Sequence, residues 1–250
     1  MIRLTGVELL KLRTTRLWIV LLSVVVGVIA LIVVAVLATP AHEPEARALH
    51  DLATVADVRQ LLQIGGLAAS FALVIGATMA TTEYRYGTAG ITYLATPTRA
   101  RVVTAKMASA LPVGAAFGLV GGCVPLLVAL VWFAAKGKSV PLDGSIPLDI
   151  VQMGLQAAFA AVMGVAVGVV LRNQVAAIVG LLVWVAVVEP LVSALIPATA
   201  RWFPFSGAAG AFSSQATDKL FGRPAAAALM AVYVVAGWAA AVWFERRRDV

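Results

Sequence analysis

The chain has 250 residues, a mean hydropathy of +0.97, 12% charged residues and a formal net charge of +7 at pH 7. A water-soluble domain of this size needs a more polar surface, so the composition excludes a soluble globular protein and indicates transmembrane helices. The apolar segments are continuous rather than alternating, which argues against a membrane β-barrel. The basic excess is typical of cytoplasmic loops, and no segment could form the basic face of a nucleic-acid-binding domain.

Six apolar segments are long enough to cross about 30 Å of hydrocarbon, which predicts an all-α polytopic membrane protein with one transmembrane domain. They cover residues 17–37, 61–80, 102–135, 150–171, 175–196 and 224–244. The first follows a basic lead-in, residues 1–16, and is longer than the apolar core of a signal peptide, so we expect it to be retained. With the N-terminus inside, Lys and Arg are denser in the inner loops than in the outer ones, which predicts that both termini are cytoplasmic.

Two of the predicted outer loops have a distinctive composition. Residues 39–60 contain Pro40, Pro44 and several acidic residues, and we expect a short helix over about 45–58. Residues 198–223 combine five Trp and Phe side chains with small residues. Such a stretch suits the membrane–water interface, where it either lies flat or dips back into the membrane.

Motifs for nucleotide or metal chemistry are incomplete in this sequence. Residues 137–139 read GKS, the end of a phosphate-binding loop, but Trp132 stands where that motif requires glycine. His42 and His50 do not have the spacing of a helical metal-binding pair. We therefore expect neither a metal site nor an enzyme, and no cofactor on this chain.

Glu189 is the only ionisable group that we predict deep within the spans, and Pro190 follows it. A carboxylate in the membrane is expensive and should face protein or water. Glu189 is therefore either a substrate or proton site, or a structural group that is hydrogen-bonded where Pro190 breaks the helix. The sequence favours the structural role and leaves the functional one open.

Glycines recur at helical spacing in the third and fourth spans. A face of small residues lets two helices approach closely, so we expect these positions to mark packing inside the bundle. They are Gly114, Gly118, Gly122, Gly164 and Gly168. Pro112 and Pro125 should kink the third span.

The segment between the second and third spans is unusually polar, aromatic and basic. Thr96 is a favourable helix N-cap and Pro97 a favourable first helical residue, so a helix is predicted to run from Pro97 into the third span. That helix would be nearly twice as long as a bilayer is thick, so it should project into the cytoplasm or break at Pro112. Thr88–Leu94 fits a short helix on the inner face, with tyrosines at headgroup level.

The sequence EYRYGTAGITYLATPTRARVVTAK, Glu83–Lys106, resembles the segment between the second and third spans of ABC-2 type transporter permeases. That family pattern reads approximately E-[YF]-R-x-G-T, a short run, P-x-R and a later Lys. The lead-in ELLKLRTTR, the six spans, VEP in the fifth span, the aromatic outer segment and the basic tail ERRRDV extend the resemblance over the whole chain.

The resemblance implies a permease subunit in the cell membrane that pairs with a second permease copy or paralogue. Each permease would dock a separate ATPase subunit, which holds ATP and Mg. Residues 83–96 would form the coupling segment, with Glu83 and Arg85 as its anchors and Arg99 at the base of the third span. The implied coupling residues are Glu83, Tyr84, Arg85, Gly87, Thr88, Ile91, Tyr93, Leu94, Pro97 and Arg99.

The family also implies that cargo passes beside the second and fifth spans at a dimer interface. These spans are apolar and fit a hydrophobic or amphipathic cargo such as a drug, antibiotic, peptide or lipid. The candidate path residues are Gln63, Ser70, Thr78, Thr81 and Glu189. Two other functions remain open: a stand-alone channel or secondary transporter that uses Glu189, and a purely structural membrane protein.

Overall fold

The computed structural model describes residues 2–39, 51–96, 98–212 and 220–247, and within them every regular element is helical. Six of the described helices are long and apolar enough to cross a membrane, which confirms the predicted fold class. They are Leu17–Ala38 (α2), Val55–Arg85 (α4, η1 and α5), Arg99–Ala135 (α7), Ile146–Leu171 (α8), Gln174–Leu195 (α9, η2 and α10) and Arg223–Arg247 (α11).

The second of these helices begins well before the predicted limit. A capping box starts α4, Val55–Leu62, because the Thr54 backbone N–H donates to Asp57 Oδ2 (2.7 Å) and the Asp57 N–H donates to Thr54 Oγ1 (3.3 Å). The 3₁₀ turn η1, Gln63–Gly66, then joins α4 to α5, Leu67–Arg85. The short helix predicted over 45–58 falls partly on residues 40–50, outside the described residues; of the described part, Asp51 and the residues from Val55 onward are helical, and residues 52–54 are not.

Three helices, α5, α7 and α8, pack most extensively against one another and form the centre of the bundle. Glycines stand where their backbones meet, because a Cβ atom at these positions would fall on atoms of the facing helix. Gly114 and Gly118 of α7 lie against Ala157 and Met153 of α8, Gly122 lies against Met153 and Ile150, and Gly164 and Gly168 of α8 lie against Leu73 and Ala77 of α5.

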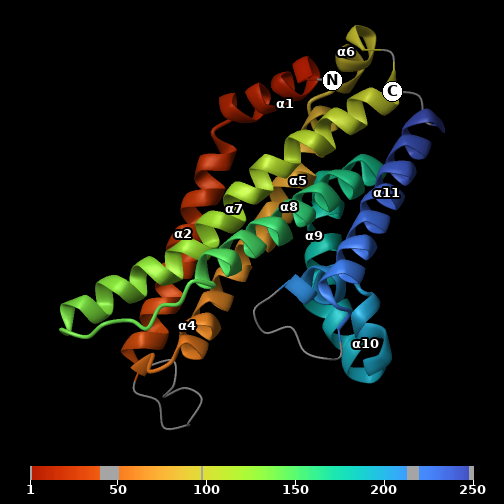
Figure 1. Cartoon of the computed structure of the whole chain (residues 1–250). Coiled ribbons are helices and arrows are strands. Elements are labelled where there is room, and N and C mark those ends of the chain that lie inside the picture. Colours follow the sequence, from red (N-terminus) through yellow and green to blue (C-terminus); the bar gives the residue numbers. More distant parts are fainter. Residues whose placement is uncertain (1, 40–50, 97, 213–219, 248–250) are drawn as a thin grey trace.

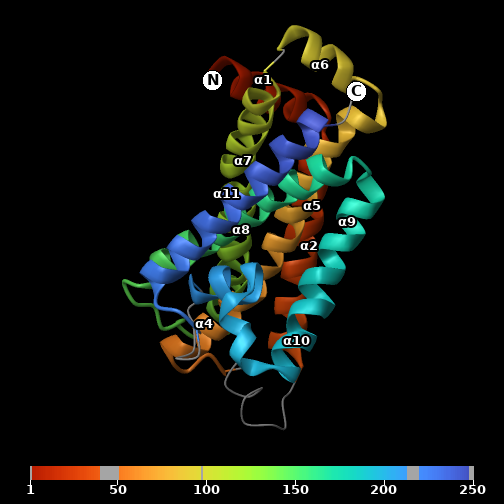
Figure 2. The same cartoon turned by 90° about the vertical axis from the view of Figure 1, so that its right-hand side faces the viewer.

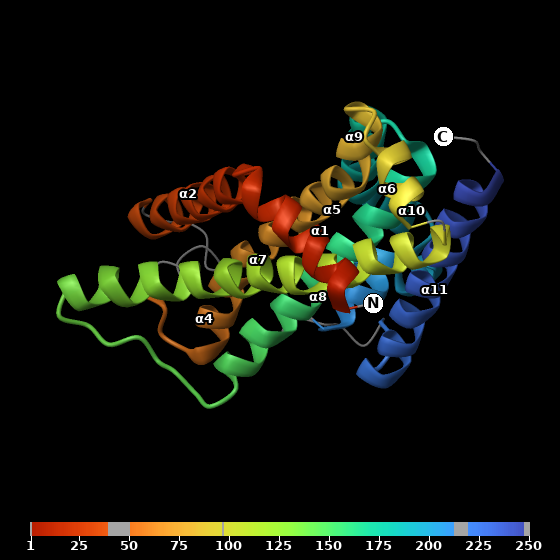
Figure 3. The same cartoon turned by 90° about the horizontal axis from the view of Figure 1, so that it is seen from above.

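The bundle has two distinct ends. The short helices α1, Ile2–Thr14, and α6, Ala89–Ala95, lie at one end beside the start of α7 and the end of α11 (Figure 1). The opposite end carries α4, α10 and the connection from α7 to α8 (Figure 2). We call these the α6 end and the α10 end. Viewed from above, α2 and α11 lie on opposite sides of the central helices (Figure 3).

Helix α7 is one continuous helix of 37 residues, about 55 Å long at 1.5 Å per residue. It runs through Pro112 and Pro125 without a break, as membrane helices can when neighbours satisfy the freed backbone groups. The predicted start is wrong, because the helix begins at Arg99 with Thr98 as its N-cap, while Thr96 closes α6. Pro97 itself lies outside the described residues. Because 55 Å exceeds the hydrocarbon thickness, α7 extends beyond the membrane or crosses it strongly tilted.

The aromatic segment after α10 folds back against the bundle. It consists of the short turns η3, Pro197–Trp202, η4, Pro204–Ala209, and η5, Gly210–Phe212. Pro204, Ala208 and Ala209 are buried, and the Phe205 ring lies 5.8 Å from the Phe159 ring of α8. The segment therefore packs against the helices of the bundle instead of standing apart from them.

The tight contact between α5 and α8 can be tested at Gly76. A Cβ atom there would fall on the backbone oxygen of Ala161, whereas one at Gly27 of α2 would meet nothing within 4 Å. We expect Gly76→Ala to lower the free energy of unfolding by about 1–3 kcal/mol through overpacking. Gly27→Ala should leave stability unchanged or raise it, because alanine favours the helix.

The measurement is thermal unfolding of each purified variant in the same detergent, followed by far-ultraviolet circular dichroism. A midpoint for Gly76→Ala at or above that of Gly27→Ala would contradict close contact between the two backbones.

Candidate functional site

The polar segment between α5 and α7 forms a short elbow at the α6 end. After α5 ends at Arg85, Gly87 reverses the chain at φ +68°, a conformation that glycine adopts without steric cost. The Thr88 backbone N–H donates to the Glu83 carbonyl oxygen (2.9 Å), and Thr88 is the N-cap of α6. The predicted short helix over 88–94 therefore corresponds to α6, which starts one residue later.

Four charged side chains from three helices form a closed network beneath this elbow. Lys106 Nζ of α7 lies 2.8 Å from both Glu8 Oε2 of α1 and Glu83 Oε1 of α5. Lys11 Nζ of α1 lies 2.8 Å from Glu8 Oε1 and 2.7 Å from Glu83 Oε1. Each cation thus contacts both carboxylates, so the charges balance. We call Glu8, Lys11, Glu83 and Lys106 the four-charge network.

The two lysines of this network differ in their exposure. Lys106 is 2% exposed, whereas the side chain of Lys11 is 43% exposed. Partial burial of Lys11 disfavours its charge, but hydrogen bonds to Glu8 and Glu83 outweigh that effect and raise the Lys11 pKa above its ordinary value. Lys11 is therefore charged at neutral pH. Lys106, which is shielded from water, connects α7 to α1 through Glu8 and to α5 through Glu83.

A second network surrounds Glu245, near the end of α11, and we call it the Glu245 network. The carboxylate is fully buried. The Tyr84 hydroxyl donates to its Oε2 (2.8 Å), and Arg172 Nη2 forms an ion pair with its Oε1 at 3.0 Å. Arg99, the first residue of α7, donates from Nη1 to the Glu245 backbone oxygen. The Arg172 guanidinium also lies 5.2 Å from the centre of the Tyr84 ring. Glu245 thereby joins α11 to α5, to α7 and to the turn after α8.

Helix α6 reaches the Glu245 network through Tyr93. Arg99 Cζ lies 5.6 Å from the centre of the Tyr93 ring. Burial raises the pKa of Tyr93, and its neighbours Tyr84 and Glu245 raise it further. The phenol therefore stays protonated at neutral pH and remains available as a hydrogen-bond donor.

The outward face of the elbow is apolar. Ile91 is 68% and Leu94 is 87% exposed, and Tyr86 is exposed beside them. A groove of about 620 Å³ runs between α1, α6 and α7, and its lining includes Val7, Ile91 and the four-charge network residues Glu8, Lys11 and Glu83. An exposed apolar surface of this kind, set among charged residues, is typical of a protein-interaction site.

The other predicted coupling residues have different surroundings. Arg85 donates to Gln174 Oε1 of α9 (3.0 Å) and stacks 5.7 Å from the Tyr86 ring, so its described contacts are with α9 and the turn rather than with α6. Pro97, also a predicted coupling residue, lies outside the described residues.

The structure brings only two of the predicted path residues into one cavity. Ser70 and Glu189 both line a cavity of about 230 Å³ between α5, α8 and the segment that folds back. Thr78 and Thr81 are buried and donate to carbonyl oxygens of their own helix, those of Ile75 and Ala77. Gln63 lies in η1 and does not line this cavity.

Glu189 is fully buried, and both of its carboxylate oxygens accept hydrogen bonds. Trp184 Nε1 (2.9 Å) and the Phe205 backbone N–H (3.3 Å) donate to Oε1, and the Ser206 N–H (2.6 Å) donates to Oε2. Trp184 begins a π-helical turn, η2, Trp184–Val188, which directly precedes Glu189. Glu189 thus caps the first turn of η4, which is the geometry of the structural role.

The sequence does not single out Glu8 and Lys11 of the four-charge network or Arg172 and Glu245 of the Glu245 network. Lys106 enters only through the family pattern. The available signals were local: Glu8 and Lys11 stand three residues apart, and Glu245 directly follows the last predicted span. The interpretation of Glu189 as the only ionisable group within the spans is also too narrow, because Lys106 and the buried Asp149 lie within α7 and α8.

A further ion-pair cluster at the α10 end was not predicted either. Arg59 of α4 lies 3.0 Å from Asp143 and 3.2 Å from Asp149 of α8, and it also donates to Ser145. A hydrogen bond from Ser145 lowers the pKa of Asp143, helped by the nearby Arg59 charge, so Asp143 is ionised at neutral pH. This cluster fastens the start of the second span to the fourth.

The four-charge network predicts unequal effects for its two lysines. Lys106→Met leaves two carboxylates facing one half-exposed lysine, so we expect a loss of about 3–5 kcal/mol in unfolding free energy. Lys11→Met removes a partly hydrated cation, and we expect a loss of about 1 kcal/mol or less. Thermal unfolding of the two purified variants in the same detergent measures both losses. Equal losses would show that the difference in burial of the two lysines does not set their contribution to stability.

Comparison with known proteins supplies a family. A family model described as ABC-2 family transporter protein matches residues 4–189, from α1 to the first residue of α10. Searches of curated proteins and of solved structures returned no match. The matched range contains the elbow, the whole four-charge network and the first four complete membrane-spanning helices, and it reaches into the fifth. The chain therefore belongs to the ABC-2 transporter family and is a multi-pass membrane protein of a transport system.

Proposed function

We propose that this chain is the permease subunit of an ATP-binding cassette exporter, driven by a separate ATPase subunit. Membership of the ABC-2 family supports the transport role. The ATPase would bind ATP and Mg, in keeping with the incomplete phosphate-binding motif near Trp132. Two permease subunits, identical or paralogous, would pair and each would dock one ATPase.

One observation carries this proposal: α6 presents Ile91 and Leu94 outward while its base is bound to buried charges. A lever that receives force from a partner needs an exposed contact surface and a stiff attachment. The four-charge network holds Glu83 just before α6, and Arg99 holds the start of α7 just after it. A push on α6 would therefore reach α1, α5, α7 and α11 together.

The proposed orientation places the α6 end in the cytoplasm of a cell-membrane protein. Exposed arginines support this assignment, because positive charge concentrates on the cytoplasmic side. Five exposed arginines lie at or next to the ends of the helices that terminate at the α6 end: Arg13, Arg16, Arg85, Arg246 and Arg247. The start of α1 and the end of α11 share this end (Figure 1), so both termini would be cytoplasmic.

The proposed cargo is hydrophobic or amphipathic and passes beside the second and fifth spans. Ser70 and Glu189 share a cavity between these spans, which supports their inclusion in the path. The buried hydrogen bonds of Thr78 and Thr81 support a packing role for these two residues instead.

Two substitutions on the outward face of α6 test the docking step. We expect the double variant Ile91→Asp/Leu94→Asp to fold normally, because both side chains are exposed, but to lose most of its co-purification with the co-expressed ABC ATPase subunit of its transporter. ATP-driven export should fall in parallel. The matched control is Leu142→Asp, an exposed leucine (51%) at the α10 end, which should leave both unchanged.

Full ATPase binding and export by the double variant would remove the basis of the proposal. Export by the purified permease in vesicles without ATP would instead support the stand-alone transporter.

The Glu245 network predicts a variant that separates docking from transport. Glu245→Gln keeps an acceptor for Tyr84 but loses the charge that faces Arg172. We expect this variant to bind the ATPase normally and to export at a reduced rate per ATP hydrolysed, because the attachment of α6 to α11 is weakened. The control is Arg246→Gln, the exposed neighbour. Unchanged coupling in Glu245→Gln would show that this network does not transmit force.

A further inference from the structure

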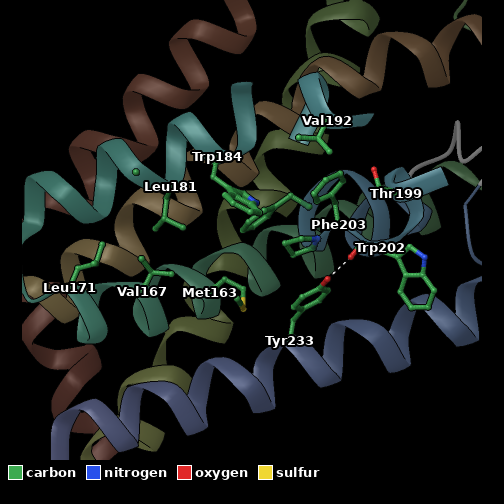
Figure 4. A pocket seen from close by; sticks show the side chains of 13 residues that line it. Met163, Val167, Leu171, Leu181, Trp184, Val192, Thr199, Trp202, Phe203 and Tyr233 are labelled. Carbon is green, nitrogen blue, oxygen red and sulfur yellow. Dashed lines mark hydrogen bonds between the residues drawn. The ribbon is translucent and has the colours of Figure 1, made fainter. Parts of the chain in front are cut away.

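A second and larger cavity lies between α8, α9, α11 and the segment that folds back, apart from the elbow and from the path residues. Its volume is about 750 Å³, within the range of about 300–1,000 Å³ that is usual for small-molecule sites. Figure 4 shows Leu181 of α9 and Trp184 of η2 facing Met163 and Val167 of α8 across it, with Tyr233 of α11 closing one side.

The lining has no ionisable group except the Tyr233 phenol, and that hydroxyl already donates to the Trp202 backbone oxygen. The remaining lining residues are aliphatic, aromatic or small, apart from one threonine, Thr199. A charged or strongly polar molecule would lose its hydration here without compensation. The occupant is therefore an apolar group.

The cavity wall is held open by hydrogen bonds behind it. Glu189 accepts from Trp184 Nε1 and from the backbone N–H groups of Phe205 and Ser206, which fixes the indole and the start of η4. The Phe203 ring packs edge-on against Trp184 at 6.4 Å. Because Glu189, which does not line the cavity, fixes the Trp184 indole, and Trp184 in turn packs against Phe203, these rings cannot simply collapse into the cavity, and the site is preformed.

The cavity is elongated along the helices. On α8 its lining runs from Met163 to Leu171, about 12 Å at helical rise, and along α9 and α10 it runs from Gly180 to Val192, about 18 Å. One leaflet contributes roughly half of a 30 Å hydrocarbon core, or about 15 Å. The length therefore matches one lipid tail lying parallel to the spans.

A cation stands at the end of the cavity nearest the α10 end. Trp202 lines the cavity there and is 53% exposed, as expected for tryptophan at a membrane interface. Arg201 Cζ lies 5.9 Å from the Trp202 ring and 5.3 Å from the Phe221 ring, and among the described residues it has cation–π contacts but no salt bridge. An exposed arginine beside an apolar slot is suited to a phosphate or another anionic headgroup.

We propose that this cavity binds one hydrocarbon tail of an anionic amphiphile from the membrane leaflet at the α10 end, with its headgroup at Arg201. Because the site lies within one permease chain and away from α6, binding requires no ATPase. Loss of the proposed coupling role would therefore leave this binding site unaffected.

Gly180 offers a direct test. It lines the cavity, and a Cβ atom built on it meets nothing within 4 Å, so Gly180→Phe should fill the cavity without a backbone clash. Gly27→Phe on α2 is the matched control, since that position is equally open and α2 contributes no residue to the cavity lining. The probe is phosphatidylglycerol with a photoactivatable diazirine in its tail, added to the full-length protein in nanodiscs.

We expect labelling of peptides from α8, α9 and α11 that falls about tenfold in Gly180→Phe and is unchanged in Gly27→Phe. Equal labelling in the two variants, or labels confined to other helices, would overturn the site. A photoreactive amino acid at position 180 that crosslinks two permease chains, in place of lipid, would also overturn it by showing that a second copy covers the cavity.

The headgroup has its own comparison. Phosphatidylcholine with the same tail should label more weakly than phosphatidylglycerol, and Arg201→Gln should abolish that difference. Equal labelling by both lipids in the unmodified protein would overturn the assignment of Arg201.

Addition of the ATPase subunit distinguishes cargo from a resident lipid. A fall in labelling that needs ATP hydrolysis would identify the amphiphile as cargo, and unchanged labelling would identify it as a resident lipid. Both results support the site.

Discussion

Pairing of buried charge is the constraint on which the α6 end depends. Lys106 and Glu245 are almost or fully removed from water, and an unpaired charge in such a place would cost several kcal/mol. Each meets an opposite charge from another helix, so neither can move far without breaking a contact that water cannot replace. The charges therefore fix where α1, α5, α7 and α11 stand relative to one another, and α6 inherits that rigidity because it is connected directly to α5 and contacts Arg99.

The two halves of the bundle obey different packing rules. Between α5, α7 and α8 the glycines allow direct backbone contact and leave little free volume. Helices α9 and α11 each contact α8, and beside them the aromatic rings of the segment that folds back line an open cavity. Glu189 lies between these regions and holds the segment in place. The dense half is suited to transmitting displacement, and the open half is suited to accommodating an apolar molecule.

Hydropathy was enough to predict the number and type of the spans, because crossing hydrocarbon demands long continuous apolar helices whatever their neighbours. The short helix beside Gly87 was predictable for a similarly local reason. The partners of Glu83 and Glu245 were not, because Lys11 lies 72 positions from Glu83 and Tyr84 lies 161 positions from Glu245. Such pairs are created by the packing of helices, and a single sequence carries no local mark of them. The start of α7 was misplaced by two residues because capping preferences at Thr96 and Thr98 are nearly equal.

The position of Glu245 in the last helix has a consequence for biogenesis. The four-charge network draws on α1, α5 and α7, so it can assemble once the third span has left the ribosome and entered the membrane. Tyr84 and Arg172 must wait for α11, which is translated after every other described helix. Until then the nascent chain carries Arg172 without its carboxylate, and the elbow lacks one of its two attachments. Completion of both networks at the α6 end thus coincides with insertion of the final helix, so the elbow is fully attached only when the whole bundle is in place.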